Sequence, residues 1–75
     1  MEKLICFEID NFEKIDLKNP INLSNSEKDF ARIGALPAKI DYPTKAYCLT
    51  ITKTNITEKV LQKIFRKYGY KAKLK

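Results

Sequence analysis

The chain has 75 residues, of which 44% are apolar and 32% are charged, and its formal net charge is +6. This composition supplies one hydrophobic core and excludes a second, so we expect a single domain over residues 1–75. It also excludes a membrane-spanning segment, because no run of about 20 apolar residues occurs.

The N-terminal residues predict a β-hairpin. Within residues 3–9, Ile or Phe occupies every second position from residue 5, the two-residue period of a half-buried strand. Asp10 and Asn11 tolerate positive φ and separate this run from a second one, which predicts a tight turn and a strand over residues 12–17. The apolar residues of the second run do not share one strand face, so its pattern is the weaker of the two.

The middle of the chain predicts a short helix and then an extended loop. Ser24 and Glu27 have the Ser-x-x-Glu spacing of a capping box, which predicts a helix that runs through Ile33. Gly34 then supplies the left-handed residue that ends it. Residues 36–44 contain two prolines, which remove backbone donors and favour extended geometry in the residue before each. We therefore expect an ordered, extended loop there.

The C-terminal part predicts a strand, a helix and an edge strand. Residues 45–53 alternate most clearly and are expected to form a central strand. Apolar residues from 60 to 68 recur at helical spacing and predict a long helix, with either Asn55 or Thr57 as its N-terminal cap. Gly69 ends this helix, and residues 70–74 alternate so that a strand there buries its apolar residues and projects lysines into water.

Together these elements predict a small α+β domain in the order β-β-short α-β-α-β. We expect a mixed β-sheet of three to four strands, with one long C-terminal helix packed on one face of it. The segment 47–74 is similar to the closing half of many ferredoxin-like small domains, an arrangement that carries no functional motif.

The two cysteines and the N-terminal residues indicate the cellular compartment in which we expect the protein. Cys6 and Cys48 are 42 positions apart in predicted strands, and neither belongs to a Cys-x-x-Cys motif. The apolar run that begins at Leu4 is cut short by Glu8, too early for a signal peptide. We therefore expect a cytoplasmic protein with reduced thiols, and a cross-strand disulfide is the alternative.

The chain lacks the residues on which several kinds of catalysis depend. The chain has no His, which removes the usual general base and the commonest metal ligand, and two Gly do not suffice for a phosphate-binding loop. Carboxylates near turns and helix starts are explained by solvation and capping. We therefore expect no enzyme activity, no catalytic residue, no metal, no cofactor and no small-molecule substrate.

Positive charge gathers late in the sequence. Residues 1–30 carry a net charge of −3, whereas residues 31–75 carry +9. Four cations of the predicted C-terminal helix lie within an arc of about 100° beside its apolar stripe. They are either lysines and arginine of an ordinary solvent-exposed helix face or, with the lysines of the last strand, a binding surface. The candidate binding residues are Lys59, Lys63, Arg66, Lys67, Lys71, Lys73 and Lys75.

We interpret the chain as a small regulatory or accessory protein, such as an inhibitor, that docks on a protein or nucleoprotein partner through this basic half and not on a membrane. The alternative is direct, largely sequence-nonspecific nucleic-acid binding by the same surface, because the chain has only two Arg for base readout. A second candidate contact for a protein partner is the proline-stiffened loop, with residues Leu36, Pro37, Lys39 and Tyr42.

Overall fold

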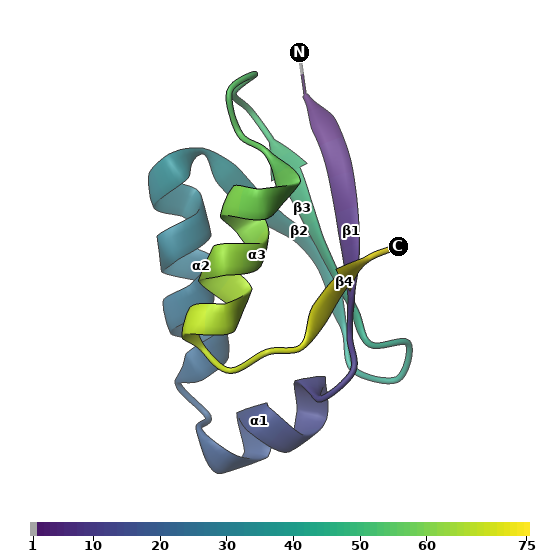
Figure 1. Ribbon diagram of the computed structural model, residues 1–75. Helices are drawn as coiled ribbons and strands as arrows, with labels where there is room; N and C mark the ends of the chain where they lie inside the picture. The colour runs from purple at the N-terminus through teal and green to yellow at the C-terminus, as the bar shows by residue number, and fades with distance from the viewer. Residues whose placement is uncertain (1) are drawn as a thin grey trace.

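The computed structural model describes residues 2–75, in which there are four strands and three helices (Figure 1). The strands are β1 (Lys3–Ile9), β2 (Ala35–Asp41), β3 (Ala46–Ile51) and β4 (Ala72–Leu74). The helices are α1 (Phe12–Lys18), α2 (Asn22–Ile33) and α3 (Glu58–Lys67). The chain is therefore α+β, but its order is β-α-α-β-β-α-β. No helix within residues 2–75 combines the length and the apolar character needed to cross a membrane.

The four strands form one sheet in the order β2-β3-β1-β4, and every neighbouring pair is antiparallel. The predicted mixed sheet is therefore wrong. β3 and β4 do run in the same direction, but β1 lies between them, so the connection through α3 skips one strand. The connection from β1 to β2 skips β3 in the same way. Two such split β-α-β units are the connectivity of ferredoxin-like domains, here with two helices in the first unit.

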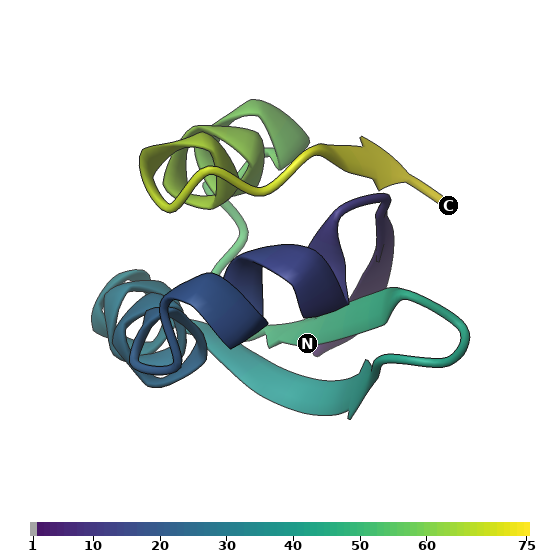
Figure 2. The same cartoon turned by 90° about the horizontal axis from the view of Figure 1, so that it is seen from below.

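The helices and the sheet form two layers. α2 and α3 lie side by side on one face of the sheet, and α1 closes one end (Figures 1 and 2). The opposite face carries no helix in the part of the chain that the structure describes. The sheet packs one face against the helices, which explains the alternating burial of β1, whereas in β3 Ala46 and Cys48 on the other face are buried as well.

The core lies between these layers, and Phe65 of α3 is at its centre. Its ring centroid is 5.0 Å from that of Phe7, 4.9 Å from that of Phe30 and 5.0 Å from that of Tyr47. All four side chains are fully buried. The sequence pattern correctly places five further strand and helix residues in this core: Ile5, Ile9, Leu49, Ile51 and Leu61.

α1 replaces the predicted second strand, so the N-terminal hairpin is wrong. Phe12, Ile15 and Asp16 are three and four positions apart and therefore share one face of a helix. Phe12 is 1% exposed and Asp16 is 8% exposed, whereas Leu17 on the other side is 76% exposed. The mismatch with a two-residue period was the signal for this helix. Asp10 and Asn11 form the turn that leads into it.

The predicted capping box is also wrong. α2 begins at Asn22, so Ser24 and Glu27 lie inside the helix, and no side chain caps its first turn. The predicted end is confirmed, because Gly34 follows Ile33 with a φ of 96°, in the left-handed region that glycine adopts at little cost.

Residues 36–44 do not form the predicted loop, because most of them belong to β2. Pro37 fits there since β2 is at the edge of the sheet, where one side of the strand needs no donors. The register shifts between Pro37 and Lys39, which marks a β-bulge. A turn then leads into β3, with Lys45 at a φ of 58° and its N–H donating to the carbonyl of Tyr42 over 3.0 Å.

α3 is confirmed as a helix but not as a long one, since it has ten residues and α2 has twelve. Thr57 is its cap, because the Thr57 hydroxyl accepts a hydrogen bond from the backbone N–H of Val60. The predicted end is confirmed in detail. The N–H of Tyr70 donates to the carbonyl of Phe65 over 3.0 Å, and Gly69 has a φ of 82°, as a Schellman motif requires.

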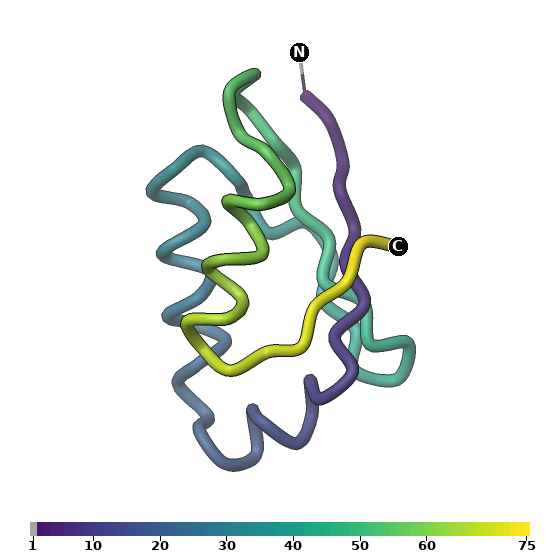
Figure 3. The backbone as a smooth tube through the Cα atoms, in the orientation of Figure 1, coloured from purple at the N-terminus to yellow at the C-terminus, as the bar shows by residue number. Residues whose placement is uncertain are grey.

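β4 is an edge strand, as predicted (Figure 3). Asn11 holds the chain that leads into it, because its side-chain N–H donates to the carbonyl of Gly69 and its side-chain oxygen accepts from the N–H of Lys71. Tyr70 is buried as expected, but Leu74 is 47% exposed. The last residue of the alternation therefore lies outside the core, because α3 does not extend over it.

Cys6 and Cys48 form a disulfide between β1 and β3. They are register partners, directly opposite each other on the face of the sheet that carries no helix. The expectation of reduced thiols is wrong, because a spacing of 42 positions does not reveal that two residues face each other. Disulfides are typical of oxidising compartments, so the cysteines give no support to the expected cytoplasmic location.

Candidate binding surface

Four of the predicted binding residues lie on one side of α3 and form a surface that we call the α3 stripe: Lys59, Lys63, Arg66 and Lys67. All four are exposed, while Leu61 and Phe65 on the opposite side of the helix are buried. The only acidic residue of α3 is Glu58, in its first turn. The helix therefore presents a nearly uninterrupted row of cations to solvent.

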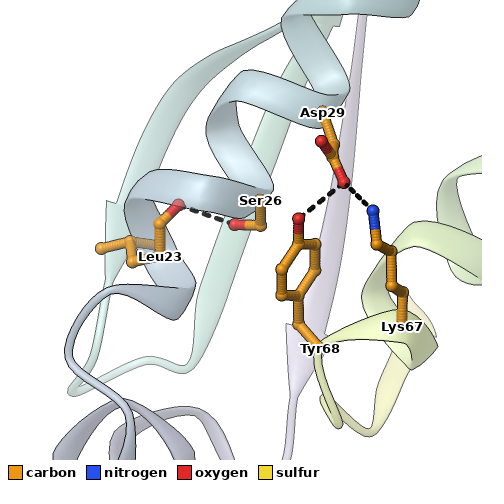
Figure 4. A network of polar contacts seen from close by, with 5 residues as sticks. All are labelled: Leu23, Ser26, Asp29, Lys67 and Tyr68. Carbon is orange, nitrogen blue, oxygen red and sulfur yellow. Dashed lines mark hydrogen bonds and ion pairs between the residues drawn. The ribbon is translucent and has the colours of Figure 1, made fainter.

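Lys67 differs from the rest of the stripe because it already has a partner. Its amino group lies 2.8 Å from a carboxylate oxygen of Asp29 on α2, and that same oxygen accepts a hydrogen bond from the hydroxyl of Tyr68 (Figure 4). The hydrogen bond from Lys67 holds the pKa of Asp29 below its usual value, and the carboxylate in turn raises the pKa of Lys67. Lys67 therefore joins the two helices.

The lysines of the last strand do not extend the α3 stripe. Lys73 is the register partner of Glu8, and their side chains form an ion pair of 3.2 Å. Glu8 points away from the buried face of β1, so Lys73 points to the face of the sheet without helices. Lys71 and Lys75 are exposed and lie just outside β4. Lys73 therefore lies on a different face of the molecule from the α3 stripe.

The residues of the predicted docking loop are not brought together at one site. Leu36 and Lys39 are exposed on the edge strand β2, and Pro37 is half-buried beside the bulge. Tyr42 lies beyond the strand, where its ring packs against that of Phe12 at 4.7 Å. The sequence analysis missed the role of Tyr42, because nothing local shows that it meets α1.

A carboxylate between two tyrosines is the feature that the sequence analysis missed most completely. Asp16 accepts hydrogen bonds from the hydroxyl of Tyr42, over 2.6 Å, and from that of Tyr70. Desolvation, together with the hydrogen bond to Asp16, raises the pKa of Tyr42 to about 12, and the same causes raise the pKa of Tyr70. Both phenols therefore stay protonated donors, and the cluster joins α1 to the two chain segments that follow β2 and α3.

Asp16→Ala is expected to lower the free energy of unfolding by about 2 kcal/mol, because it leaves the buried Tyr70 hydroxyl without an acceptor. Urea unfolding followed by circular dichroism measures this change. Glu13→Ala is the matched control on the exposed side of α1 and is expected to change the free energy of unfolding by less than about 0.5 kcal/mol. Equal unfolding midpoints for the two variants would contradict a structural role for Asp16.

A cleft opens beside the first turn of α3. It has a volume of about 810 Å³ and lies between that turn, the start of β1 and the end of β3 with the connection that follows it. Its lining combines isoleucines with lysines, among them Lys59 of the α3 stripe. Sequence reasoning missed this cleft, because its walls come from three segments that are far apart in the chain.

Two further observations concern the polar side chains of residues 2–75. No three His, Cys, Asp or Glu side chains among them are grouped so that they hold a metal ion, and no buried side-chain nitrogen or oxygen lacks a hydrogen-bond partner. Ser26 is an example, because its buried hydroxyl donates to the carbonyl of Leu23 over 2.8 Å (Figure 4). The same hydroxyl also lies 3.0 Å from the hydroxyl of Tyr47.

No protein-family model, curated protein or solved structure matches the chain. Because the ferredoxin-like connectivity occurs in proteins of many functions, it assigns none here. Function is therefore inferred from the surface of the molecule itself.

Proposed function

We propose that the chain is a small non-catalytic regulatory or accessory protein that docks on an acidic surface of a protein or nucleoprotein partner through the α3 stripe. The observation that carries this proposal is that three cations of the stripe have no acidic partner within residues 2–75. Lys59, Lys63 and Arg66 project from one helix, and none of them belongs to an ion pair within residues 2–75. Lys59 and Lys63 are like charges four positions apart, an arrangement that costs an isolated helix roughly 0.2–0.5 kcal/mol.

The surroundings of the stripe favour a protein partner over bare nucleic acid. Single-stranded nucleic acid is commonly held by exposed aromatic rings on which bases stack. Around α3 these rings are engaged, since Phe65 and Tyr70 are buried and the amino group of Lys67 lies over the ring of Tyr68, 5.3 Å from its centroid. Beside the stripe lie an exposed Val60 on the same helix and, at the N-terminal end of α3, a cleft with an aliphatic floor. Apolar contacts within a charged rim are typical of protein interfaces.

Reversing the two unpaired cations in the middle of the stripe is expected to weaken docking strongly. Lys63→Glu with Arg66→Glu weakens partner binding by roughly tenfold or more, because complementary charge becomes like charge. Lys14→Glu with Lys18→Glu changes the net charge equally on α1 and is expected to leave binding intact. The measurement is capture of partner proteins by the immobilised domain from nuclease-treated extract, followed by titration of the captured protein.

Two results contradict the proposal. One is equal capture by the two double variants. The other is loss of all capture after nuclease treatment, together with direct binding of the domain to purified RNA or DNA that falls steeply with salt concentration, which establishes nucleic-acid binding instead. Lys67 is left unchanged in this experiment, because its ion pair with Asp29 joins two helices and a change there mixes stability with binding.

A further inference from the structure

The cleft at the N-terminal end of α3 has a floor made of aliphatic side chains. Ile5 and Ile51 come from the two central strands, and Ile56 comes from the connection that leads into the helix. Ile5 and Ile51 are only 7% and 5% exposed, and Ile56 is half-buried. The floor therefore offers a small apolar area, enough to accept one side chain rather than to enclose a long apolar ligand.

The rim of the cleft is charged, with an excess of cations. Lys3, Lys53 and Lys59 line it, against Glu2 and Glu58. Lys3 and Lys53 are exposed and belong to no ion pair within residues 2–75. The N-terminal end of α3 also carries the positive end of the helix dipole, which favours negative charge nearby.

The cleft and the α3 stripe form one continuous path, because Lys59 belongs to both. From there the stripe continues through Lys63 and Arg66 along the outer side of the helix. A ligand that follows this path therefore meets the aliphatic floor of the cleft at one end and a row of cations after it. No aromatic side chain among residues 2–75 lines the cleft, so this part of the chain offers no surface there on which a nucleic-acid base stacks.

We propose, on the basis of the function proposed above, that this cleft receives one large apolar side chain from an acidic segment of the partner protein. The segment lies across the rim, its carboxylates facing Lys3, Lys53 and Lys59, and continues along the α3 stripe. Apolar contact in the cleft then supplies affinity, while the cations set the orientation and the rate of association.

The first test is a titration of the ¹⁵N-labelled protein with a short synthetic peptide of Asp and Glu that has one central Phe. We expect chemical-shift changes at residues 3–5 and 53–59, and roughly tenfold weaker binding when the Phe is replaced by Ala, because burial of the ring is lost. A peptide in which Gln replaces the acids is expected to bind weakly. Equal affinity for the Phe and Ala peptides would overturn the inference, as would a lack of shift changes in the cleft.

The second test uses two neighbouring exposed positions in the connection before α3. Thr54 lines the cleft and Asn55 does not. Thr54→Trp is expected to weaken binding of the Phe peptide by roughly tenfold through occupation of the cleft, and Asn55→Trp is expected to leave it unchanged. If both variants bind equally well while Lys63→Glu with Arg66→Glu abolishes binding, the cleft has no role but docking through the stripe stands. An RNA or DNA oligonucleotide that shifts the cleft resonances more than the Phe peptide also overturns the inference.

Discussion

Phe65→Ala is expected to remove between about a third and all of the protein's stability. The Phe65 ring is completely buried and touches three other buried aromatic rings, so truncation leaves a cavity that α3 and the sheet cannot close. Such a change costs about 4 kcal/mol. A domain of this length has a total stability of only roughly 4–11 kcal/mol.

Urea unfolding of the variant, followed by far-UV circular dichroism, measures this effect. Phe65→Leu keeps most of the volume and is expected to cost about 1.5 kcal/mol. Leu17→Ala removes a side chain of similar size that is 76% exposed, and it is expected to leave the midpoint almost unchanged. A cooperative transition of Phe65→Ala at the wild-type midpoint would show that this ring is not the centre of the core.

Loss of the disulfide is expected to have a comparable effect. The bond closes a loop between positions 42 apart, and the chain-entropy treatment of such a loop gives about 4 kcal/mol of stabilisation. Cys6→Ala with Cys48→Ala is therefore expected to lower the urea midpoint strongly, and a dithiol reductant is expected to do the same to the wild-type protein by converting the bond to two thiols. The double variant is the control for the reductant, since its midpoint should not respond.

Thiol titration of the unfolded protein without reductant provides an independent check. The bonded pair predicts no reactive thiol in protein prepared under oxidising conditions, and full reaction of both cysteines only after reduction. Two reactive thiols before reduction, or an unchanged urea midpoint after it, would contradict a stabilising bond. The bond lies on the helix-free face of the sheet, so it makes no direct contact with the α3 stripe.

Lys67 belongs both to the proposed binding surface and to a contact that joins two helices. Lys67 was grouped with the other cations of α3 because of its spacing, but its ion pair with Asp29 gives it a structural role. Lys59, Lys63 and Arg66 are therefore the residues on which charge reversal tests binding most directly. Spacing on a helix identifies a face, but only the neighbouring helix shows which members of that face are already engaged.

Elements with local sequence signals could be predicted before the structure was known. The alternation in β1 and β3 defined their buried faces, because a strand with one buried face repeats every two residues. The end of α3 was predicted from Gly69 and Tyr70, and the end of α2 from Gly34. A glycine just after the last turn commonly adopts the left-handed conformation that ends a helix. The α3 stripe was recognised in the same way, from helical spacing alone.

The tertiary structure alone decided features that depend on partners distant in the sequence. Whether residues 12–17 form a helix or a strand was settled by the burial of Phe12 and Asp16 against later segments. The disulfide, the antiparallel strand order and the cleft all require knowledge of which strands are neighbours. Local patterns show the periodicity of one segment. Which strands and side chains become neighbours depends on the free energy of packing the whole chain, and this cannot be read from any single segment.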